Sequence, residues 1–195
     1  MGYEKINEPM MVPSVLGPDG LPFAAGGGGT DGASLVSADA SVAVSDTGWS
    51  IQKVVLTLTD FVMTVDATDE FEGQLLLTNP AGKDKILVGA SAHLAIELSG
   101  GYSGGQLMQM GIGTAEVAVA ALTGTTDDIV LSATMGGSGL TGRTWEQNMG
   151  SDPGRAPMNF PGGNEVWLNT VSTGIATDGI QTITGTITLY YVEII

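Results

Sequence analysis

The sequence contains no cysteine and a single histidine, His93, in 195 residues. Disulfide bonds and thiolate zinc sites are therefore excluded, and packing alone has to hold the fold together. Enzymes usually gather a proton-transfer group, a nucleophile or metal ligands in a pocket, and this chain offers few such groups. We therefore expect a protein that is not an enzyme and that uses no cofactor.

Charge is also scarce, and it is mostly of one sign. Charged residues make up 14% of the chain, against roughly 25% in an average soluble protein. The 21 acidic residues outnumber the 6 basic ones, which gives a net charge of -15. Nucleic acids and anionic membranes are bound mainly through Lys and Arg, so we expect neither as a partner. A largely neutral surface is instead typical of protein interfaces.

Long apolar runs are missing as well. A membrane-spanning helix needs roughly 18 consecutive apolar residues, and the sequence has no such stretch. The first residues also lack the basic and apolar regions of a signal peptide. We expect neither a membrane span nor a cleaved leader.

Residues 1–48 differ from the rest of the chain in composition. Prolines recur between residues 9 and 22, and residues 26–29 are all glycine, which argues against a central strand or a helix. Apolar side chains are nevertheless frequent there. We predict an extended N-terminal arm over residues 1–48 that lies on a neighbouring subunit, with a disordered leader as the alternative. The candidate partner-binding residues of the arm are Tyr3, Ile6, Met10, Met11, Leu16 and Phe23.

From about Trp49 onward, apolar residues recur at every second position, which indicates β-strands. The clearest example is the last, where Ile183, Ile187 and Leu189 alternate with threonines. Residues 114–122 are rich in alanine and fit a short helix less well than a strand. Strand patterns cover residues 53–65, 75–77, 85–98, 106–121, 129–135, 164–171 and 182–191.

These patterns predict an all-β fold. About eight strands are separated by turns of Gly, Ser and Asp, and no segment shows a convincing helical stripe. We predict one antiparallel β-sandwich or jelly roll over residues 49–195. The exception is a long loop over residues 136–163, rich in Gly and Pro, whose aromatic residues dock onto the domain itself or onto a neighbour. We count Trp145 and Phe160 of this loop among the candidate partner-binding residues.

Three patterns resemble a phosphate, catalytic or metal site, but none matches a known motif in full. Residues 137–144 have the glycine spacing of a phosphate-binding loop, but no helix follows to supply amide groups. His93 lies mid-strand, opposite the apolar face, and no Gly-x-Ser-x-Gly motif accompanies it, so we interpret it as a surface or interface residue. The acidic turn that contains Asp66, Asp69, Glu70 and Glu72 leaves calcium binding open, although its spacing matches no EF-hand loop.

The order of strand patterns from Trp49 to Ile195 resembles a known group of viral proteins. Its members are the decoration, or cement, proteins of tailed bacteriophages, which bind the outside of the capsid. The N-terminal arm is not part of the resemblance. The segments that carry it are residues 53–59, 62–68, 73–77, 86–90 and 183–192.

The resemblance implies a trimeric jelly-roll module that clamps neighbouring subunits of the major capsid protein at the outer surface of the virion. The neutral surface, the extended arm and the acidity that avoids DNA agree with this expectation. Synthesis would take place in the host cytoplasm. Three alternatives remain: a tail or fibre component, a jelly roll that itself forms a shell, and a carbohydrate-binding or calcium-binding β-sandwich module.

Overall fold

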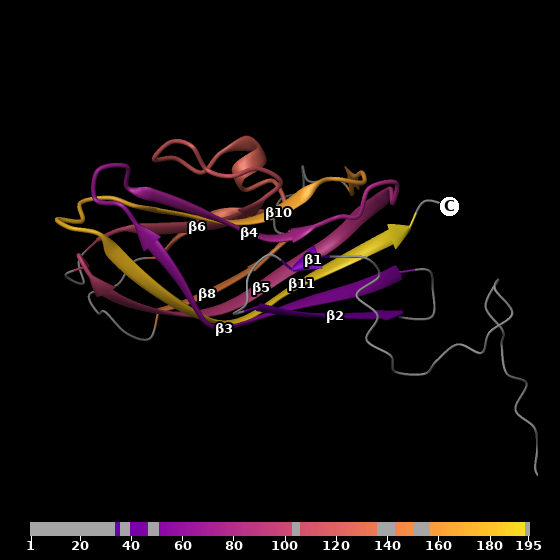
Figure 1. The fold of residues 1–195 in the computed structure, drawn as a ribbon, viewed down its shortest axis with the longest axis horizontal. Coiled ribbons are helices and arrows are strands. Elements are labelled where there is room, and N and C mark those ends of the chain that lie inside the picture. The colour runs from indigo at the N-terminus through magenta and orange to yellow at the C-terminus, as the bar shows by residue number, and fades with distance from the viewer. Residues whose placement is uncertain are drawn as a thin grey trace, which may run out of the picture.

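The computed structural model shows two antiparallel β-sheets packed face to face (Figure 1). It describes residues 34–35, 40–46, 51–102, 106–135, 143–149 and 157–193. Over these residues the chain has no α-helix, and a 3-10 turn spans Gly124–Thr126. The all-β sandwich predicted from the alternating pattern is therefore confirmed.

The two sheets differ in size. The five-stranded sheet has the order β1-β4-β10-β6-β7, and the six-stranded sheet has the order β2-β3-β11-β5-β8, with β9 also pairing with β5. The strands are β1 (Ser34–Leu35), β2 (Ala40–Asp46), β3 (Ile51–Val65), β4 (Phe71–Thr78), β5 (Lys85–Gly100), β6 (Met108–Gly113), β7 (Val130–Met135), β8 (Arg143–Asn148), β9 (Met158–Phe160), β10 (Glu165–Ser172) and β11 (Gly179–Glu193).

Eight of the strands pair as one long folded hairpin. The innermost pair is β6 with β7, followed outward by β5 with β8, β4 with β10 and β3 with β11. The chain changes sheet between successive members of this series, except from β6 to β7. Rolling up the hairpin in this way gives the jelly-roll arrangement.

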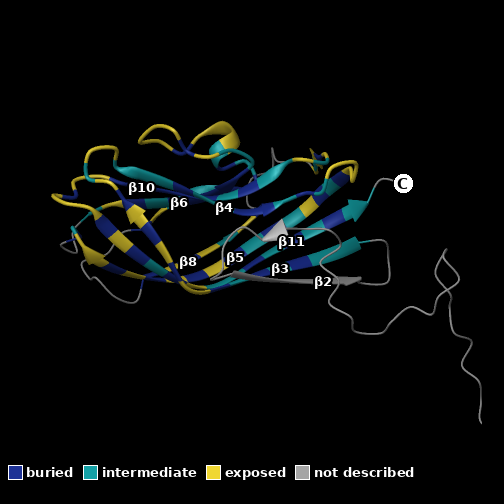
Figure 2. Cartoon of the chain, in the orientation of Figure 1, coloured by how far each residue is buried: buried dark blue, intermediate teal, exposed yellow. Residues whose placement is uncertain are grey.

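The strands form where the sequence alternates because successive side chains point to opposite faces of a sheet. In β3 the side chains of Val54, Leu56 and Leu58 are buried, whereas Val55 and Thr57 between them are half-buried on the outer face. The same alternation runs through β5 and β11, and Figure 2 shows it as bands along these strands. Each long strand therefore gives one face to the interior and one to solvent.

One apolar core joins both sheets. It includes Leu56, Leu94 and Ile187 from the six-stranded sheet, and Met110 and Leu168 from the five-stranded sheet, all at most 2% exposed. Burial of a large aliphatic side chain stabilises a fold by about 1.5–3 kcal/mol. A core of this kind explains how the chain folds without disulfide bonds.

The structure changes two boundaries predicted from the sequence. Strands β1 and β2 lie within the segment assigned to the arm, and they pair with β4 and β3, respectively. Residues 1–33, with all the candidate residues of the arm, lie outside the described residues. The predicted loop 136–163 contains β8 and β9, both paired with β5. The many glycines and prolines of this segment argued against strands, but two short strands form there because each pairs with β5.

The predicted strand over residues 106–121 also ends earlier than expected. Strand β6 stops at Gly113, and residues 114–129 form an irregular loop that holds the 3-10 turn. We call residues 114–129 the covering loop, because they lie over the outer face of the five-stranded sheet (Figure 1). The Val-x-Val pattern at residues 117–119 is therefore not a strand: Val117 is buried, and Val119 is exposed.

Candidate interaction surface

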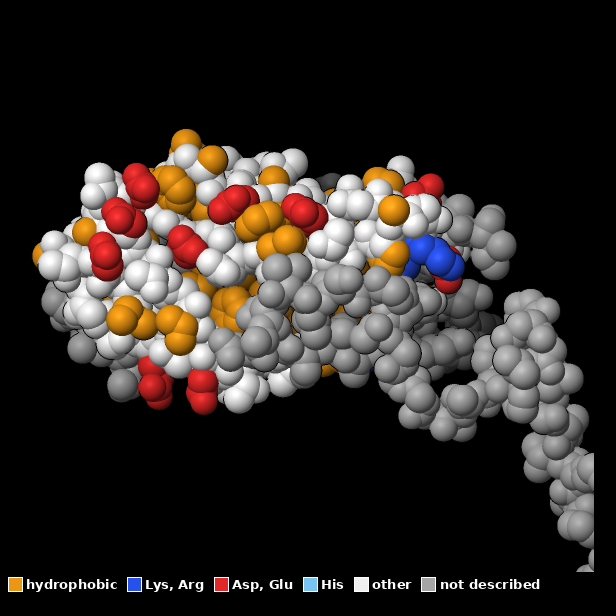
Figure 3. Space-filling view, viewed as in Figure 1, with side chains coloured by type: hydrophobic (Ala, Val, Ile, Leu, Met, Phe, Trp, Pro, Cys, Tyr) orange, Lys and Arg blue, Asp and Glu red, His pale blue; other side chains and the backbone are white. Residues whose placement is uncertain are grey.

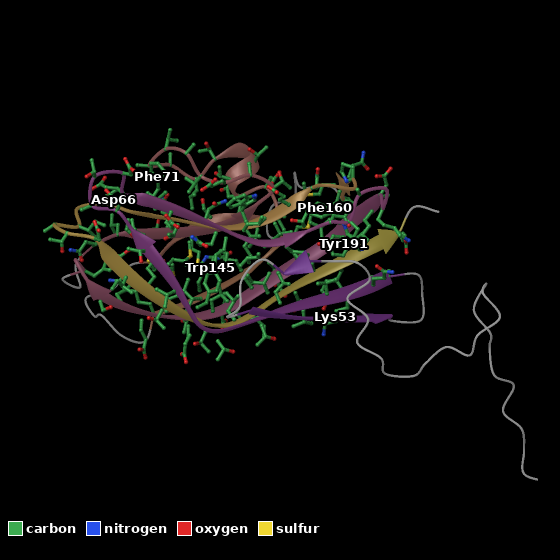
Figure 4. The ribbon with its side chains drawn as sticks, in the orientation of Figure 1. Lys53, Asp66, Phe71, Trp145, Phe160 and Tyr191 are labelled. Carbon is green, nitrogen blue, oxygen red and sulfur yellow. The ribbon has the colours of Figure 1, made fainter. Side chains whose placement is uncertain are left out.

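Trp145 and Phe160, the two candidate partner-binding residues that the structure describes, are 2% and 1% exposed. Trp145 pairs with Leu94 across β8 and β5, and its side chain belongs to the core. The ring of Phe160 lies 5.6 Å from the ring of Tyr191, centroid to centroid. Figure 4 labels all three aromatic residues. The two side chains therefore pack within their own domain, and their burial does not fit a direct contact with a partner.

The acidic turn between β3 and β4 uses its carboxylates to hold the turn itself. The Asp66 carboxylate accepts the backbone N–H groups of Thr68 and Asp69, at 2.6 and 3.3 Å. These bonds hold the pKa of Asp66 below its usual value. The carboxylate of Glu70 accepts the N–H of Gly174, and that of Asp178 accepts the N–H of Ala67, so two neighbouring turns are tied together.

No group of three or more potential metal ligands occurs within the part of the chain that the structure describes. Among the four residues of the predicted acidic turn, Glu72 lies in β4, where its carboxylate accepts a hydrogen bond from Gln74. A calcium ion in this turn would compete with the amide groups that already bind Asp66 and Glu70. The geometry therefore supports a structural role for the turn.

The outer face of the six-stranded sheet is mostly neutral. Strand β11 presents Thr182, Thr184, Thr186 and Thr188 at alternate positions, each at least partly exposed. His93 lies in the neighbouring strand β5, directly beside Thr186, and its side chain is 58% exposed. Its Nδ1 atom is 3.8 Å from the carboxylate of Glu146 in β8. His93 is thus a surface residue, as its position opposite Leu94 predicts.

A hollow of about 360 Å³ interrupts this face near the edge of the sheet. It lies where β5 passes from its partner β9, at Leu87, to its partner β8, at Ser91. Its walls combine apolar and polar groups, including Val88, Tyr190 and Asn148. This composition suits a small polar ligand with an apolar face, or an extended peptide.

The outer face of the five-stranded sheet is covered by the chain itself, and Asn169 holds the cover in place. Asn169 lies in the middle of β10 and is fully buried. Its amide oxygen accepts the N–H of Val117 at 3.0 Å. Its amide nitrogen donates to the carbonyl groups of Ala115 and Thr126, at 2.9 and 2.8 Å. One side chain thus pairs three backbone groups of the covering loop, which would otherwise be buried without partners.

Glycines in the sheet below make room for the covering loop. A Cβ atom at Gly113 would lie 2.2 Å from the carbonyl oxygen of Thr125, and one at Gly73 would lie 2.7 Å from Oδ1 of Asn169. Any side chain at Gly113 would therefore push the loop off the sheet. A second hydrogen-bonded pair, Thr114 with Asp128, closes the base of the loop at 2.8 Å.

The same loop exposes a short run of apolar residues. Val117 and Leu122 are 3% and 5% exposed and pack with Val171 and Phe71 in a small cluster apart from the main core. Between them, residues 118–121 are all apolar and all exposed. Val119 is 61% exposed. We call residues 118–121, Ala-Val-Ala-Ala, the apolar tip.

Sequence reasoning did not find this surface. The signal available was the alanine-rich stretch over residues 114–122, which favours a strand over a short helix in the sequence but forms neither in the structure. A second signal was Asn169, a polar residue within an apolar strand pattern. Neither reveals that the two segments meet, because 52 residues separate Asn169 from Val117.

No family model matches the chain, and no curated protein matches its sequence. In the part of the chain that the structure describes, no helix is long and apolar enough to cross a membrane.

Proposed function

We propose that this chain is a structural protein without enzymatic activity that binds the outer surface of a bacteriophage head. There it would cement neighbouring subunits of the major capsid protein. The observation that carries the proposal is the jelly-roll pairing of β3 to β11, in a chain whose strand order resembles phage decoration proteins. Jelly rolls recur in viral capsid proteins and in lectins.

The surface chemistry supports an outward position on the head. The outer face of the six-stranded sheet carries a row of threonines on β11 and little charge, which suits a face turned away from the shell toward solvent. The net charge of -15 repels packaged DNA. A position outside the shell keeps the acidic chain away from the genome.

Such a module would strengthen the junctions between shell subunits through the surface area that it buries there. A packaged genome strains the junctions between shell subunits, and a protein bound across a junction has to be removed before the junction opens. A standard interface buries on the order of 1,600 Å², and three linked copies add avidity. We therefore propose a trimer at the junctions of the shell, which light scattering of the purified chain would test.

The first experiment measures binding to phage heads that lack the chain. Purified protein is mixed with such heads, which are then sedimented, and the bound fraction is measured against protein concentration. We expect saturable binding at micromolar concentrations and a higher temperature of head disruption. An unrelated jelly-roll protein of similar net charge serves as the control. Absence of saturable binding would contradict the proposal.

A deletion tests the predicted arm separately. Removal of residues 1–33 takes away all six candidate residues of the arm, and it spares β1 and β2. We expect the shortened chain to fold and to bind heads at least tenfold more weakly. Unchanged binding and unchanged heat resistance of the heads would show that the arm has no part in docking.

The hollow beside Tyr190 favours a second candidate function, binding of a carbohydrate. The ring of Tyr190 lines this hollow together with the polar side chains of Asn148 and Ser91. A sugar could stack on such a ring and form hydrogen bonds with the polar groups. A ligand that binds only the folded state raises the melting temperature. A glycan that raises it in the wild type but not in Tyr190→Ala would favour this candidate.

A further inference from the structure

The apolar tip is unusual because four consecutive apolar residues face solvent on an ordered loop. Single exposed apolar side chains are common on proteins, but a contiguous group more often marks a contact surface. Here residues 118–121 are all exposed, and Val119 is 61% exposed. Phe71, half-buried at the start of β4, packs against the cluster that supports the tip.

The tip is held in one position from both sides. Val117 immediately before it and Leu122 immediately after it are buried. The backbone N–H of Val117 donates to the buried side chain of Asn169. The 3-10 turn that follows is closed by bonds between Thr123 and Thr126. A contact surface fixed before binding loses little conformational entropy when a partner arrives.

Charge is distributed unevenly between the two ends of the sandwich, and the apolar tip lies at the acidic end. Glu116, two residues before the tip, is exposed. The turn that holds Asp66 leads straight into Phe71, and Figure 4 labels both residues at this end of the sandwich. Figure 3 shows acidic side chains around the apolar ones at this end.

The described lysines lie at the opposite end. Lys83 forms an ion pair with Glu193 at the end of β11, whereas Asp178 directly precedes the start of that strand. Lys53 lies opposite Tyr190, also near the end of β11. The 15 residues of β11 span about 50 Å, so these lysines do not neutralise the acidic end. The remaining described cation, Arg143, is buried.

We infer that the apolar tip, together with Phe71, is the surface by which this chain docks onto the shell protein. Its binding site on that protein is an apolar recess rimmed by Lys and Arg. The inference rests on the proposed function and names the contact that the function uses. A second copy of the chain is a poor occupant, because the acidic ends of two copies would repel each other. A basic rim would attract this end and orient it.

Two matched variants test this inference in the sedimentation assay with phage heads. Val119→Asp places a charge in the apolar tip, and Val62→Asp places the same charge on the outer face of β3, where Val62 is 51% exposed. Melting temperatures first establish that both variants fold, and Val119→Ser replaces Val119→Asp if the latter does not. We expect Val119→Asp to weaken binding at least tenfold and Val62→Asp to change it less than twofold.

The contribution of the acidic end is tested with the variant Glu116→Lys and by raising the salt concentration. We expect this variant to weaken binding about tenfold at low ionic strength, with a smaller effect at high salt because screening reduces the attraction. Equal binding by Val119→Asp and the wild type would overturn the docking inference and leave the proposed function standing. Equal losses in Val119→Asp and Val62→Asp would also overturn it. If the wild type itself does not bind heads, both the inference and the proposed function fall.

Discussion

The side-chain amide of Gln181 in β11 donates a hydrogen bond to the hydroxyl group of Thr170 in β10, with 3.0 Å between Nε2 and Oγ1. This bond joins the two sheets through the interior of the sandwich. The same amide lies 2.7 Å from the Tyr102 hydroxyl, which donates to Ser172. All four side chains are buried, so they form a polar connection between the two sheets within the apolar core.

Replacement of Gln181 by Ala should lower the free energy of unfolding by about 2–4 kcal/mol, because it removes the buried hydrogen bonds from its amide to the hydroxyl groups of Thr170 and Tyr102. Urea denaturation followed by circular dichroism measures the change. Gln109→Ala is the matched control: its amide bonds Thr134 on the exposed face of β6, and its loss should cost about 0.5 kcal/mol or less. A similar loss in both variants would show that the network does not stabilise the core.

Two buried tyrosines should respond in opposite directions to removal of the hydroxyl group. The Tyr191 hydroxyl has no hydrogen-bond partner among the described residues, whereas that of Tyr102 has two. Tyr191→Phe should therefore raise the free energy of unfolding by about 1 kcal/mol, and Tyr102→Phe should lower it by about 1–2 kcal/mol. Denaturation of both variants side by side measures the difference. Destabilisation by Tyr191→Phe would reveal a partner for its hydroxyl group.

Alkaline pH should destabilise the protein through the same two residues. Burial raises the pKa of Tyr191 and of Tyr102 above the usual value of 10.0, so the folded state keeps its protons where the unfolded chain loses them. Their contribution is complete below pH 10 and is lost as the pH rises above it. Between its unfolded and folded pKa values Tyr191 contributes a slope of up to about 1.4 kcal/mol per pH unit, and Tyr102 adds to it in the same direction. Tyr191→Phe should reduce the slope measured between pH 10 and 11, and an unchanged slope would contradict this assignment.

The side chain of Asn169 should keep the covering loop ordered, although Asn169 itself is buried and does not touch the shell protein. Asn169→Ala removes three hydrogen bonds to the loop and should cost about 2–4 kcal/mol of stability. Hydrogen exchange over residues 114–129 should accelerate by at least tenfold, and binding to phage heads should weaken although the apolar tip is unchanged. Asn159→Ala, at an exposed position of β9, is the control. Unchanged exchange in Asn169→Ala would show that packing alone holds the loop.

The long strands were predictable because their signal is local. In β3, β5 and β11 most inward residues are apolar, with Gln181 an exception, and most of their neighbours tolerate water, so this period of two can be read within a few positions. Strand β8 was not predicted from the sequence because it has only six residues, and one of them, Arg143, is both charged and buried. No local rule predicts a buried arginine in a strand, since its acceptors include the distant carbonyl group of Gln106.

By itself, the sequence determined the class of fold, the alternation of faces and the acidic, weakly charged surface, because these depend on composition and on neighbours along the chain. Only the tertiary structure decided the pairing of β3 with β11, the jelly-roll order of the strands and the position of the covering loop, which is hydrogen-bonded to Asn169. It also placed Trp145 and Phe160, which the sequence left free to dock onto the domain itself or onto a neighbour, in the core of their own domain. These outcomes depend on contacts between residues far apart in the sequence, and many strand pairings satisfy the same local alternation.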